Sequence, residues 1–314
     1  MAGARPAPAA ASPAVATHAF DAIGTRWRID TERPLDEAIV ARIDDVVERF
    51  DREWSRFRVD SVVSDLADRA AIAPATVPAP RDAAAMLDLY AALSEATTGA
   101  VNPLVGDALA RRGYDPASSL VDCGAEPAPA RWRELLGWDG DRLRLAEPAT
   151  IDVGALGKGR LVDLVGAVLA EASLSRFTVD ASGDLLLRGG GAGGAVDPGE
   201  RIALEHPFDP SRAIGVWTLA EGALCASAVG RRAWPGADGG GLHHVLDART
   251  GEPVRTIAAT WATAPDTMTA DAAATALFFA GGERFAAAHG VEWVRMATSG
   301  RVEWSPGCGA ELFT

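Results

Sequence analysis

The sequence is poor in cysteine, has no long apolar run and carries no excess of positive charge, and each of these absences excludes a class of protein. Its three cysteines, Cys123, Cys225 and Cys308, have neither metal-ligand spacing nor the pattern of a disulfide framework, which favours a reducing compartment. No apolar stretch approaches the roughly 20 residues needed to span a bilayer. We therefore expect no membrane span. At a net charge of −13 the surface repels phosphate backbones, so we also expect no nucleic-acid partner.

The start of the chain has an unusual composition. Residues 1–17 are dominated by alanine and proline, and Arg5 is their only charged side chain. A secretory signal needs a basic start and then a continuous apolar run, and the prolines interrupt every such run. We therefore predict a disordered tail over 1–17, one domain over 18–314 and a cytoplasmic protein, with export as the alternative.

Hydrophobic periodicity gives a coarse secondary structure for the rest. Apolar residues at helical spacing predict helices over 35–54, 81–97 and 269–280, and another that follows Gly159. Alternating or short apolar runs predict strands over 18–29, 142–145, 150–153, 177–180, 185–187, 202–204 and 215–219, and a hairpin from 245–247 and 253–254. Because strands cluster and helices lie between the clusters, the sequence predicts an α+β fold.

Two oxygen-bearing side chains mark the segment Thr269-Ala-Asp-Ala-Ala-Ala-Thr275. Asp271 and Thr275 are four residues apart, so on a helix they project from one face. Carboxylate and hydroxyl oxygens are the ligands that Mg²⁺ prefers, and this ion usually takes few protein ligands. The alternative is structural: Thr269 caps the helix, and Asp271 complements the dipole at its N-terminus.

Three glycines punctuate the segment Ile151-Asp-Val-Gly-Ala-Leu-Gly-Lys-Gly-Arg160. Glycines let a backbone approach a ligand closely, a helix start offers amides to an anion, and Lys158 adds positive charge. The spacing fits neither a Walker loop nor a dinucleotide fingerprint. Taken alone, the segment is either a phosphate site or a tight strand-to-helix turn.

Two of the five histidines, His243 and His244, stand before the predicted hairpin in Gly241-Leu-His-His-Val-Leu-Asp-Ala-Arg-Thr-Gly251. Histidine is the usual general base near neutral pH, and the alternative is a plain surface histidine followed by turn residues. Three further segments suit either a binding site or ordinary helix ends and turns: 54–58, 98–106 and 180–184.

Taken in order from Phe20 to Phe279, these segments resemble the ApbE family of FAD:protein FMN transferases. The resemblance rests on Phe20-Asp-Ala-Ile-Gly-Thr25, Trp54-Ser-Arg-Phe57, Gly99-Ala-Val-Asn-Pro-Leu-Val-Gly106, Asp152-Val-Gly-Ala-Leu-Gly-Lys-Gly159 with Asp163, Ser182-Gly183-Asp184, His244-Val-Leu-Asp-Ala-Arg-Thr-Gly251 and the helix from Thr269 to Leu277. Each motif alone is weak, and their order makes the resemblance specific. It implies the ApbE-like fold, with mixed or antiparallel sheets and flanking helices.

The resemblance also implies a site and an activity. It implies flavin contacts from Ile23, Phe57, Ala100, Val101, Asn102, Lys158, Asp163, Asp184 and Val245, a magnesium ion held by the Ala155 carbonyl and the side chains of Asp271 and Thr275, and His244 as base. The implied reaction attaches FMN from FAD through a phosphoester bond to a Ser or Thr hydroxyl of an acceptor flavoprotein and releases AMP. The alternatives are a magnesium-dependent FAD pyrophosphatase, which gives FMN and AMP, and a flavin-binding protein without turnover.

Three positions depart from the family's pattern. Ile23 replaces Met, which conserves volume, and Asn102 replaces Asp, which loses a charge but keeps a hydrogen-bonding side chain. Ala226-Ser-Ala228 stands where the family has T-S-G, so we expect altered geometry near the acceptor peptide. Successive strand residues point to opposite faces, so only one of the two histidines can enter the site. The resemblance implies that it is His244, which stands at the position of the family's histidine directly before Val245.

Overall fold

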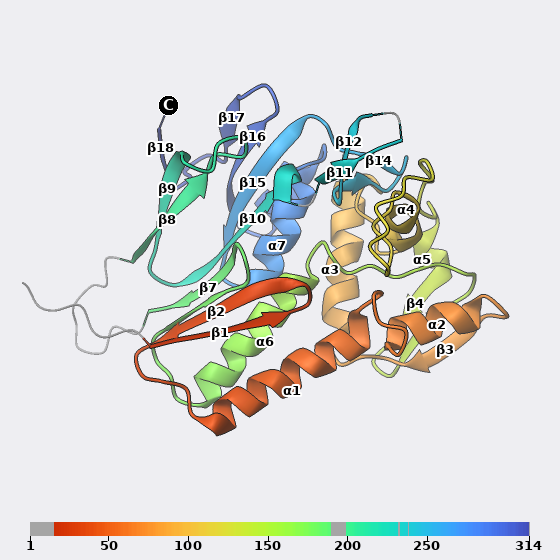
Figure 1. Ribbon diagram of the computed structural model, residues 1–314, viewed down its shortest axis with the longest axis horizontal. Helices are drawn as coiled ribbons and strands as arrows, with labels where there is room; N and C mark the ends of the chain where they lie inside the picture. Colours follow the sequence, from red (N-terminus) through yellow and green to blue (C-terminus); the bar gives the residue numbers. More distant parts are fainter. Residues whose placement is uncertain (1–15, 190–198, 232, 238, 314) are drawn as a thin grey trace, which may run out of the picture.

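The computed structural model describes residues 16–189, 199–231, 233–237 and 239–313 (Figure 1). Its largest element is an eight-stranded sheet in the order β1-β2-β6-β7-β10-β15-β16-β17, in which neighbouring strands are antiparallel. These strands are β1 Ala16–Ala22, β2 Thr25–Thr31, β6 Phe177–Asp180, β7 Asp184–Arg188, β10 Gly222–Ala228, β15 Ile257–Ala264, β16 Glu292–Ala297 and β17 Val302–Trp304. Antiparallel strands with helices packed on them confirm the predicted α+β class.

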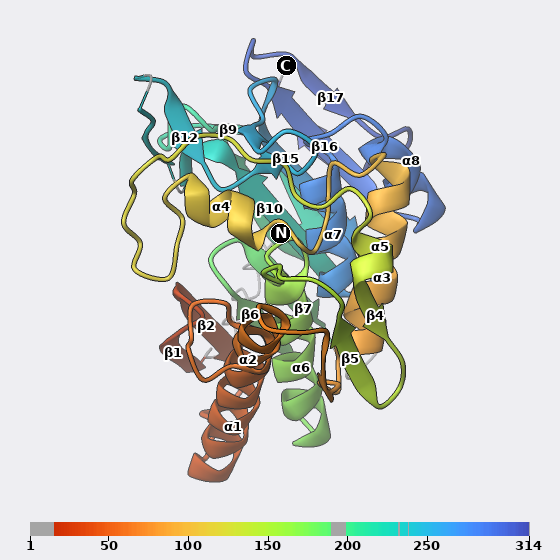
Figure 2. The same ribbon diagram turned by 90° about the vertical axis from the view of Figure 1, so that its right-hand side faces the viewer.

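Helices cover one face of this sheet (Figures 1 and 2). The helices in the described part of the chain are α1 Glu37–Trp54, α2 Val62–Ala70, α3 Ala83–Ala96, α4 Gly106–Arg111, α5 Trp132–Leu135, α6 Gly157–Glu171, α7 Thr267–Ala276 and α8 Gly282–Ala288, and α6 and α7 make most of the contacts with the sheet. α6 packs on β6 and β7, α7 packs on β10 and β15, and the two helices contact each other. α1 packs against α6, and both α3 and α8 pack against α7. The larger apolar core lies between this helical layer and the sheet.

A smaller sheet covers the opposite face. It has the order β18-β9-β8, formed by β18 Glu311–Leu312, β9 Ala213–Leu219 and β8 Glu200–Glu205. Its Leu204 and Trp217 pack against Trp261 and other residues of the central sheet in a second apolar core. Three small sheets complete the fold: β3 Ala75–Pro78 with β5 Arg142–Leu145 and β4 Leu136–Trp138, β11 Ala233–Pro235 with β12 Gly241–His243, and β13 Leu246–Asp247 with β14 Glu252–Pro253. The last of these confirms the predicted hairpin.

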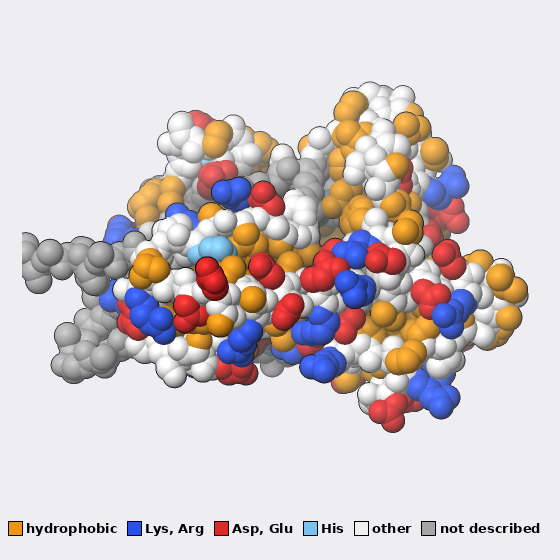
Figure 3. Space-filling view, turned by 60° about the horizontal axis from the view of Figure 1, so that its bottom comes forward, with side chains coloured by type: hydrophobic (Ala, Val, Ile, Leu, Met, Phe, Trp, Pro, Cys, Tyr) orange, Lys and Arg blue, Asp and Glu red, His pale blue; other side chains and the backbone are white. Residues whose placement is uncertain are grey.

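α1 starts at a cap and has two unlike faces. The Asp36 side chain accepts the backbone N–H of Ile39 at 2.9 Å, which satisfies an amide that the helix leaves unpaired. One face buries Ile39 and Phe50 in the core, and the other belongs to a surface where charges of both signs are interspersed (Figure 3). No helix in the described part of the chain is long and apolar enough to cross a membrane.

Residues 18–29 form a hairpin, and not the single strand that the sequence predicted. Ile23 and Gly24 make the turn with φ of +44° and +72°. A β-branched residue rarely adopts such a positive φ, so the turn is strained at Ile23. The indole N–H of the buried Trp27 donates to the Ala22 carbonyl at 3.2 Å and braces the turn.

Two further predictions are corrected. The strand predicted over 150–153 is an extended segment with no strand partner among the described residues, because its backbone bonds elsewhere: the Asp152 N–H donates to the Pro103 carbonyl at 2.8 Å. The disordered tail predicted over 1–17 is wrong for its last two residues, because Ala16 and Thr17 belong to β1. Residues 1–15 lie outside the described part of the chain.

Candidate active site

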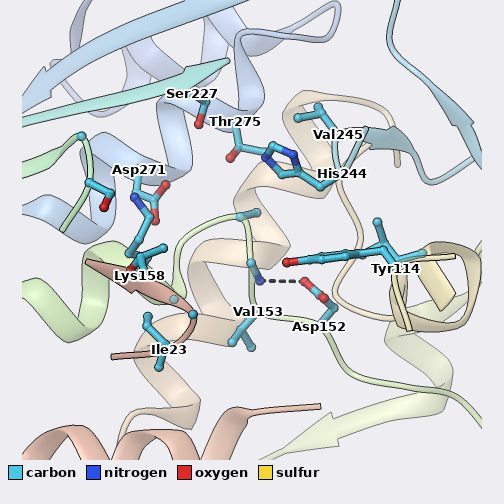
Figure 4. Close-up of a pocket in the computed structure, with 18 of the residues that line it drawn as sticks. Ile23, Tyr114, Asp152, Val153, Lys158, Ser227, His244, Val245, Asp271 and Thr275 are labelled. Carbon is cyan, nitrogen blue, oxygen red and sulfur yellow. Dashed lines mark hydrogen bonds between the residues drawn. The ribbon is translucent and has the colours of Figure 1, made fainter. Parts of the chain in front are cut away.

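A cavity of about 1170 Å³ is built from distant parts of the chain (Figure 4). Common ligand pockets measure about 300–1000 Å³, so this one has room for a ligand of dinucleotide size. The predicted site residues that line it are Ile23, Phe57, Ala100, Val101, Asn102, Ala155, Lys158, His244, Val245, Asp271 and Thr275. Two others, Asp163 and Asp184, do not line it.

α7 presents Asp271 and Thr275 to the cavity, as their spacing predicts (Figure 4). Asp271 is buried, and its Oδ2 accepts the backbone N–H of Gly159 at 2.9 Å. A Cβ on Gly159 would lie 2.4 Å from the Thr267 carbonyl oxygen and 2.8 Å from the Asp271 Cβ. Only glycine therefore lets the start of α6 approach α7 this closely.

Two carboxylates cap the start of α7 outside the cavity. Asp266 accepts the N–H of Thr269 at 2.8 Å, so the cap is Asp266, and the alternative that Thr269 caps this helix is wrong. Asp163, which the resemblance assigned to the flavin, accepts the backbone N–H groups of Thr267 at 2.8 Å and Met268 at 2.9 Å. Burial raises the pKa of Asp163 above its ordinary value, although these two amides oppose the rise. Asp163 thus joins α6 to the start of α7, and its carboxylate is occupied away from the cavity.

Lys158, Asp184 and Asp271 form a buried charge cluster beside the glycine turn. Lys158 pairs with Asp184 and donates to the Ala181 carbonyl at 3.2 Å, and Asp184 is 1% exposed. Burial raises the pKa of Asp271 well above its usual range and Asp184 raises it further, whereas Lys158 opposes the rise. Burial alone would lower the pKa of Lys158, but Asp184 and Asp271 raise it above its ordinary value. When both carboxylates are ionised, they outnumber the one ammonium, and a bound cation would balance the excess negative charge.

The oxygen groups beside this cluster fit a magnesium ion. The Asp271 carboxylate, the Thr275 side chain and residue Ala155, whose carbonyl is the third predicted ligand, line the same cavity. Mg²⁺ completes such a small set with water or phosphate oxygens. Within the described residues no group of three or more His, Cys, Asp or Glu is placed to hold a metal ion, so a metal here would depend on this mixed set.

The segment that contains Ala155 is held from two sides. Arg56 Nε donates to Asp152 Oδ2 at 2.5 Å, and the Asp152 Oδ1 accepts the Gly154 N–H at 2.7 Å (dashed in Figure 4). The Tyr90 hydroxyl donates to the Asp152 carbonyl at 3.0 Å and accepts the Ala155 N–H at 3.2 Å. These four bonds fix the backbone around Ala155.

An aromatic wall borders the same cavity. The rings of Phe57 and Tyr114 meet edge to face at 5.3 Å, and Tyr114 stacks on Trp234 at 5.9 Å. The Arg56 guanidinium lies 4.2 Å from the Phe57 ring centre and 5.0 Å from that of Tyr114. Phe57 is 40% exposed, which leaves an aromatic surface against which a planar ring can stack.

His244 lines the cavity, and His243 does not. Figure 4 shows the His244 ring beside Thr275. His243 is buried: its Nε2 donates to the Val254 carbonyl at 2.7 Å, and its Nδ1 accepts the Val245 N–H at 3.3 Å. Burial lowers the pKa of His243, and the bond to Val254 opposes this only in part. The placement is the one expected for His244, whose role as a base stays a prediction.

The Ala100–Asn102 segment is pinned by its neighbours. Asn102 Nδ2 donates to the Pro129 carbonyl at 2.9 Å, and its Oδ1 accepts the Leu104 N–H at 2.9 Å. The Ala100 carbonyl accepts the N–H of Ala248 at 3.0 Å. An ionised aspartate has no N–H to give to Pro129, so asparagine suits this loop.

Four residues that shape the cavity were not among the predicted site residues: Arg56, Tyr90, Tyr114 and Asp152. Arg56 and Asp152 lie inside segments that the sequence analysis identified. Their opposite charges were the sequence signal that could have indicated an ion pair between them. Tyr90 has the pattern of a buried helix residue, and Tyr114 lies in a segment without periodicity, so the sequence contains no signal for either.

Solved structures of flavin transferases share this fold. The flavin transferase ApbE of Vibrio cholerae has a TM-score of 0.75 at 21% identity, covering 93% of this chain and 96% of that one. The apbe protein of Thermotoga maritima has a TM-score of 0.78 at 22% identity, covering 93% of this chain and 97% of that one. At these identities the likeness shows the fold alone, and it places the chain in the fold class of the flavin transferases.

The chain belongs to the ApbE family, whose family model matches residues 23–295. The FAD:protein FMN transferase of Klebsiella pneumoniae (strain 342) is 24% identical over 293 residues, or 87% of this chain and 81% of the relative. The protein of the same name from Rhodobacter capsulatus is 33% identical over 184 residues, or 55% of this chain and 33% of the relative. The chain is therefore an enzyme of the transferase class.

Proposed function

We propose that the chain is a magnesium-dependent FAD:protein FMN transferase, which moves FMN from FAD to a Ser or Thr hydroxyl of an acceptor protein through a phosphoester bond. The observation that carries this proposal is the meeting of Lys158, His244 and the Asp271–Thr275 pair in one cavity beside an aromatic wall. The names of the relatives support it.

FAD fits the parts of the cavity by its own chemistry. Its planar isoalloxazine would stack on the ring of Phe57, with Ile23 and Val245 as further apolar contacts. Its pyrophosphate would lie at the start of α6, where the positive end of the helix dipole and the Lys158 ammonium both favour an anion. The positive charge that meets this anionic substrate would thus come from the helix start, Lys158 and the bound metal ion together.

The Ala155 carbonyl, Asp271 and Thr275 would hold the metal. A bound magnesium ion would neutralise the pyrophosphate and stabilise AMP as it leaves. Lys158 would donate to a phosphate oxygen as negative charge develops there.

His244 would accept the proton of the incoming hydroxyl. The hydroxyl oxygen then forms a bond to the FMN phosphorus, while the bond from this phosphorus to the bridging oxygen breaks and AMP leaves with the electron pair. The expected products are FMN esterified to the acceptor protein and free AMP, with the proton on His244.

One incubation tests the proposal against its alternatives. The protein is mixed with FAD, Mg²⁺ and candidate acceptor proteins, and flavin and nucleotide products are separated, with a sample in chelator as control. Fluorescent FMN bound to an acceptor supports transfer. Free FMN with AMP would identify a pyrophosphatase instead, and unchanged FAD would identify a binding protein. The cytoplasmic location expected from composition also stays a proposal, which cell fractionation tests.

A further inference from the structure

Asp184 occupies a rigid position behind the cavity wall. It is the first residue of β7, directly after Ser182 and Gly183, which turn the chain with φ of +57° and +107°. The N–H of Ala181 donates to the Asp184 carbonyl at 2.9 Å, and the N–H of Ala226 donates to the Gly183 carbonyl at 3.0 Å. The carboxylate is therefore placed by the backbone of two strands, and it is 1% exposed.

The partner of this carboxylate is Lys158, the only lysine in the chain. An ammonium has three N–H groups, and here one faces Asp184 and another faces the Ala181 carbonyl. The third remains for a ligand in the cavity. Asp184 Oδ1 has no hydrogen-bond partner among the described residues, so the buried charge of Asp184 depends on Lys158 for compensation.

A second carboxylate, that of Asp271, also acts on the same ammonium. Figure 4 shows Lys158 beside Asp271, and both Asp184 and Asp271 attract the lysine charge. Asp271 is also the only carboxylate in the predicted magnesium set. An ammonium released from Asp184 would still be attracted by Asp271, and by pairing with it would occupy the carboxylate that a cation needs.

We propose that Asp184 is a positioning residue that holds the Lys158 ammonium back from Asp271 and so keeps the Asp271 carboxylate available for Mg²⁺. This inference rests on the magnesium dependence of the proposed function. It gives Asp184 a role through Lys158 and not through contact with the flavin.

Metal binding in charge-matched variants tests the proposal. Calorimetric titration with Mg²⁺ alone compares the wild-type protein with Asp184→Asn, which keeps the side-chain shape and removes its charge. We expect the dissociation constant for Mg²⁺ to rise about tenfold. In a Lys158→Met background the same change should have almost no effect, because no ammonium is left to occupy Asp271. A simple loss of negative charge near the metal would instead weaken binding equally in both backgrounds, and that result would overturn the proposal.

The single lysine provides a direct readout that does not depend on the Lys158→Met variant folding. Lysine labelled with ¹³C at Cε gives one side-chain signal for the folded protein, from Lys158. In the wild-type protein, Mg²⁺ should shift this signal only slightly, because the ammonium stays on Asp184. In Asp184→Asn the signal should differ before Mg²⁺ is added and move strongly during the titration, as the ion displaces the ammonium from Asp271. An unchanged signal in Asp184→Asn would also overturn the proposal.

Asp180→Asn is the matched control, because Asp180 belongs to the same turn and accepts the Gly183 N–H at 3.1 Å, whereas the ion pair of Lys158 is with Asp184. It should keep the wild-type affinity for Mg²⁺ and the wild-type lysine signal. Both readouts are independent of turnover, so a protein that binds Mg²⁺ as expected but transfers no FMN would contradict the proposed function alone.

Discussion

Gly159 donates its backbone N–H to the Asp271 carboxylate at 2.9 Å, and this bond joins the start of α6 to the middle of α7. The contact places the glycine turn, which would meet the phosphates, directly beside the acidic residue that would meet the metal. The two motifs lie more than a hundred positions apart in the sequence, and their joint function depends on this contact.

We expect Asp271→Ala to abolish FMN transfer in Mg²⁺ and to leave the fold intact. The change removes the only carboxylate of the predicted metal set and a partner of one buried amide. Transfer assays and thermal melts measure the two effects. Asp266→Ala is the control on the same helix: it removes the N-cap and should cost about 1 kcal/mol of stability with transfer retained. Near-wild-type transfer by Asp271→Ala would show that the metal assignment is wrong.

Gly159→Ala should damage both stability and activity. Its Cβ would lie 2.4 Å from a backbone oxygen of α7, so the two helices must separate. Forced overpacking costs roughly 1–3 kcal/mol, and the same shift moves Asp271. In Gly137→Ala, the nearest atom would be 3.9 Å from the new Cβ, so this control should change the free energy of unfolding by no more than about 0.5 kcal/mol. Chemical denaturation of both variants measures the free energy of unfolding. An equally small change in Gly159→Ala would contradict the prediction.

His244→Ala should lower single-turnover AMP release by about 10²–10⁴-fold, the usual contribution of a general base. FAD binding should persist, because the pyrophosphate contacts come from the glycine turn and the metal. His243→Ala should remain within a few-fold of the wild-type rate, since its ring bonds to Val254 outside the cavity. The reverse ranking of the two variants at matched FAD saturation would contradict the orientation of this segment.

His243 should make stability depend on pH in a predictable direction. Burial lowers its pKa below the ordinary value of 6.5, so below about pH 6.5 the unfolded chain binds a proton that the folded protein resists. Its contribution to stability is therefore complete above that pH and declines as the pH falls toward the lowered pKa of the folded state. Urea denaturation between pH 7.5 and 5 should show this loss in the wild type. His243→Gln should show a shallower decline, and an identical decline would reject the assignment.

Tyr90→Phe should raise the Mg²⁺ concentration needed for half-maximal transfer several-fold. The hydroxyl joins the Asp152 carbonyl to the Ala155 amide, and its loss frees the segment whose carbonyl is a predicted metal ligand. The stability cost should be about 1 kcal/mol, typical of one hydrogen bond. A magnesium titration of activity tests the first expectation and a melt tests the second. Unchanged magnesium dependence would show that Ala155 is positioned without Tyr90.

The sequence predicted those elements whose pattern is determined by their own residues. The apolar spacing of α1 and α6 and the turn between β13 and β14 are local properties, and each appears where it was expected. The segment 150–153 was misassigned because its bonding partners are Pro103 and Asp107, which no local pattern reveals. The hairpin at Ile23 was missed because a β-branched residue with positive φ contradicts ordinary turn preferences.

The same limit applied to the site. The four-residue spacing of Asp271 and Thr275 predicted that both lie on one face of a helix. The order of the motifs along the chain indicated the family. Asp163 accepts hydrogen bonds from α7 amides because α6 packs against α7. Asp184 pairs with Lys158 because β7 packs against α6. Arg56, Tyr90 and Tyr114 shape the cavity only through contacts that long-range packing creates.

In the central sheet the strands lie side by side in the same order as along the chain, from β1 to β17. This is also the order in which they are synthesised. Each new strand can therefore join the edge left by the one before it, without separating strands already paired. The cavity needs α7, which follows β15, so a growing chain builds most of the sheet before any ligand site exists. Until β15 emerges, the edge of β10 stays open to other chains, and neither FAD nor a metal can yet favour the native arrangement.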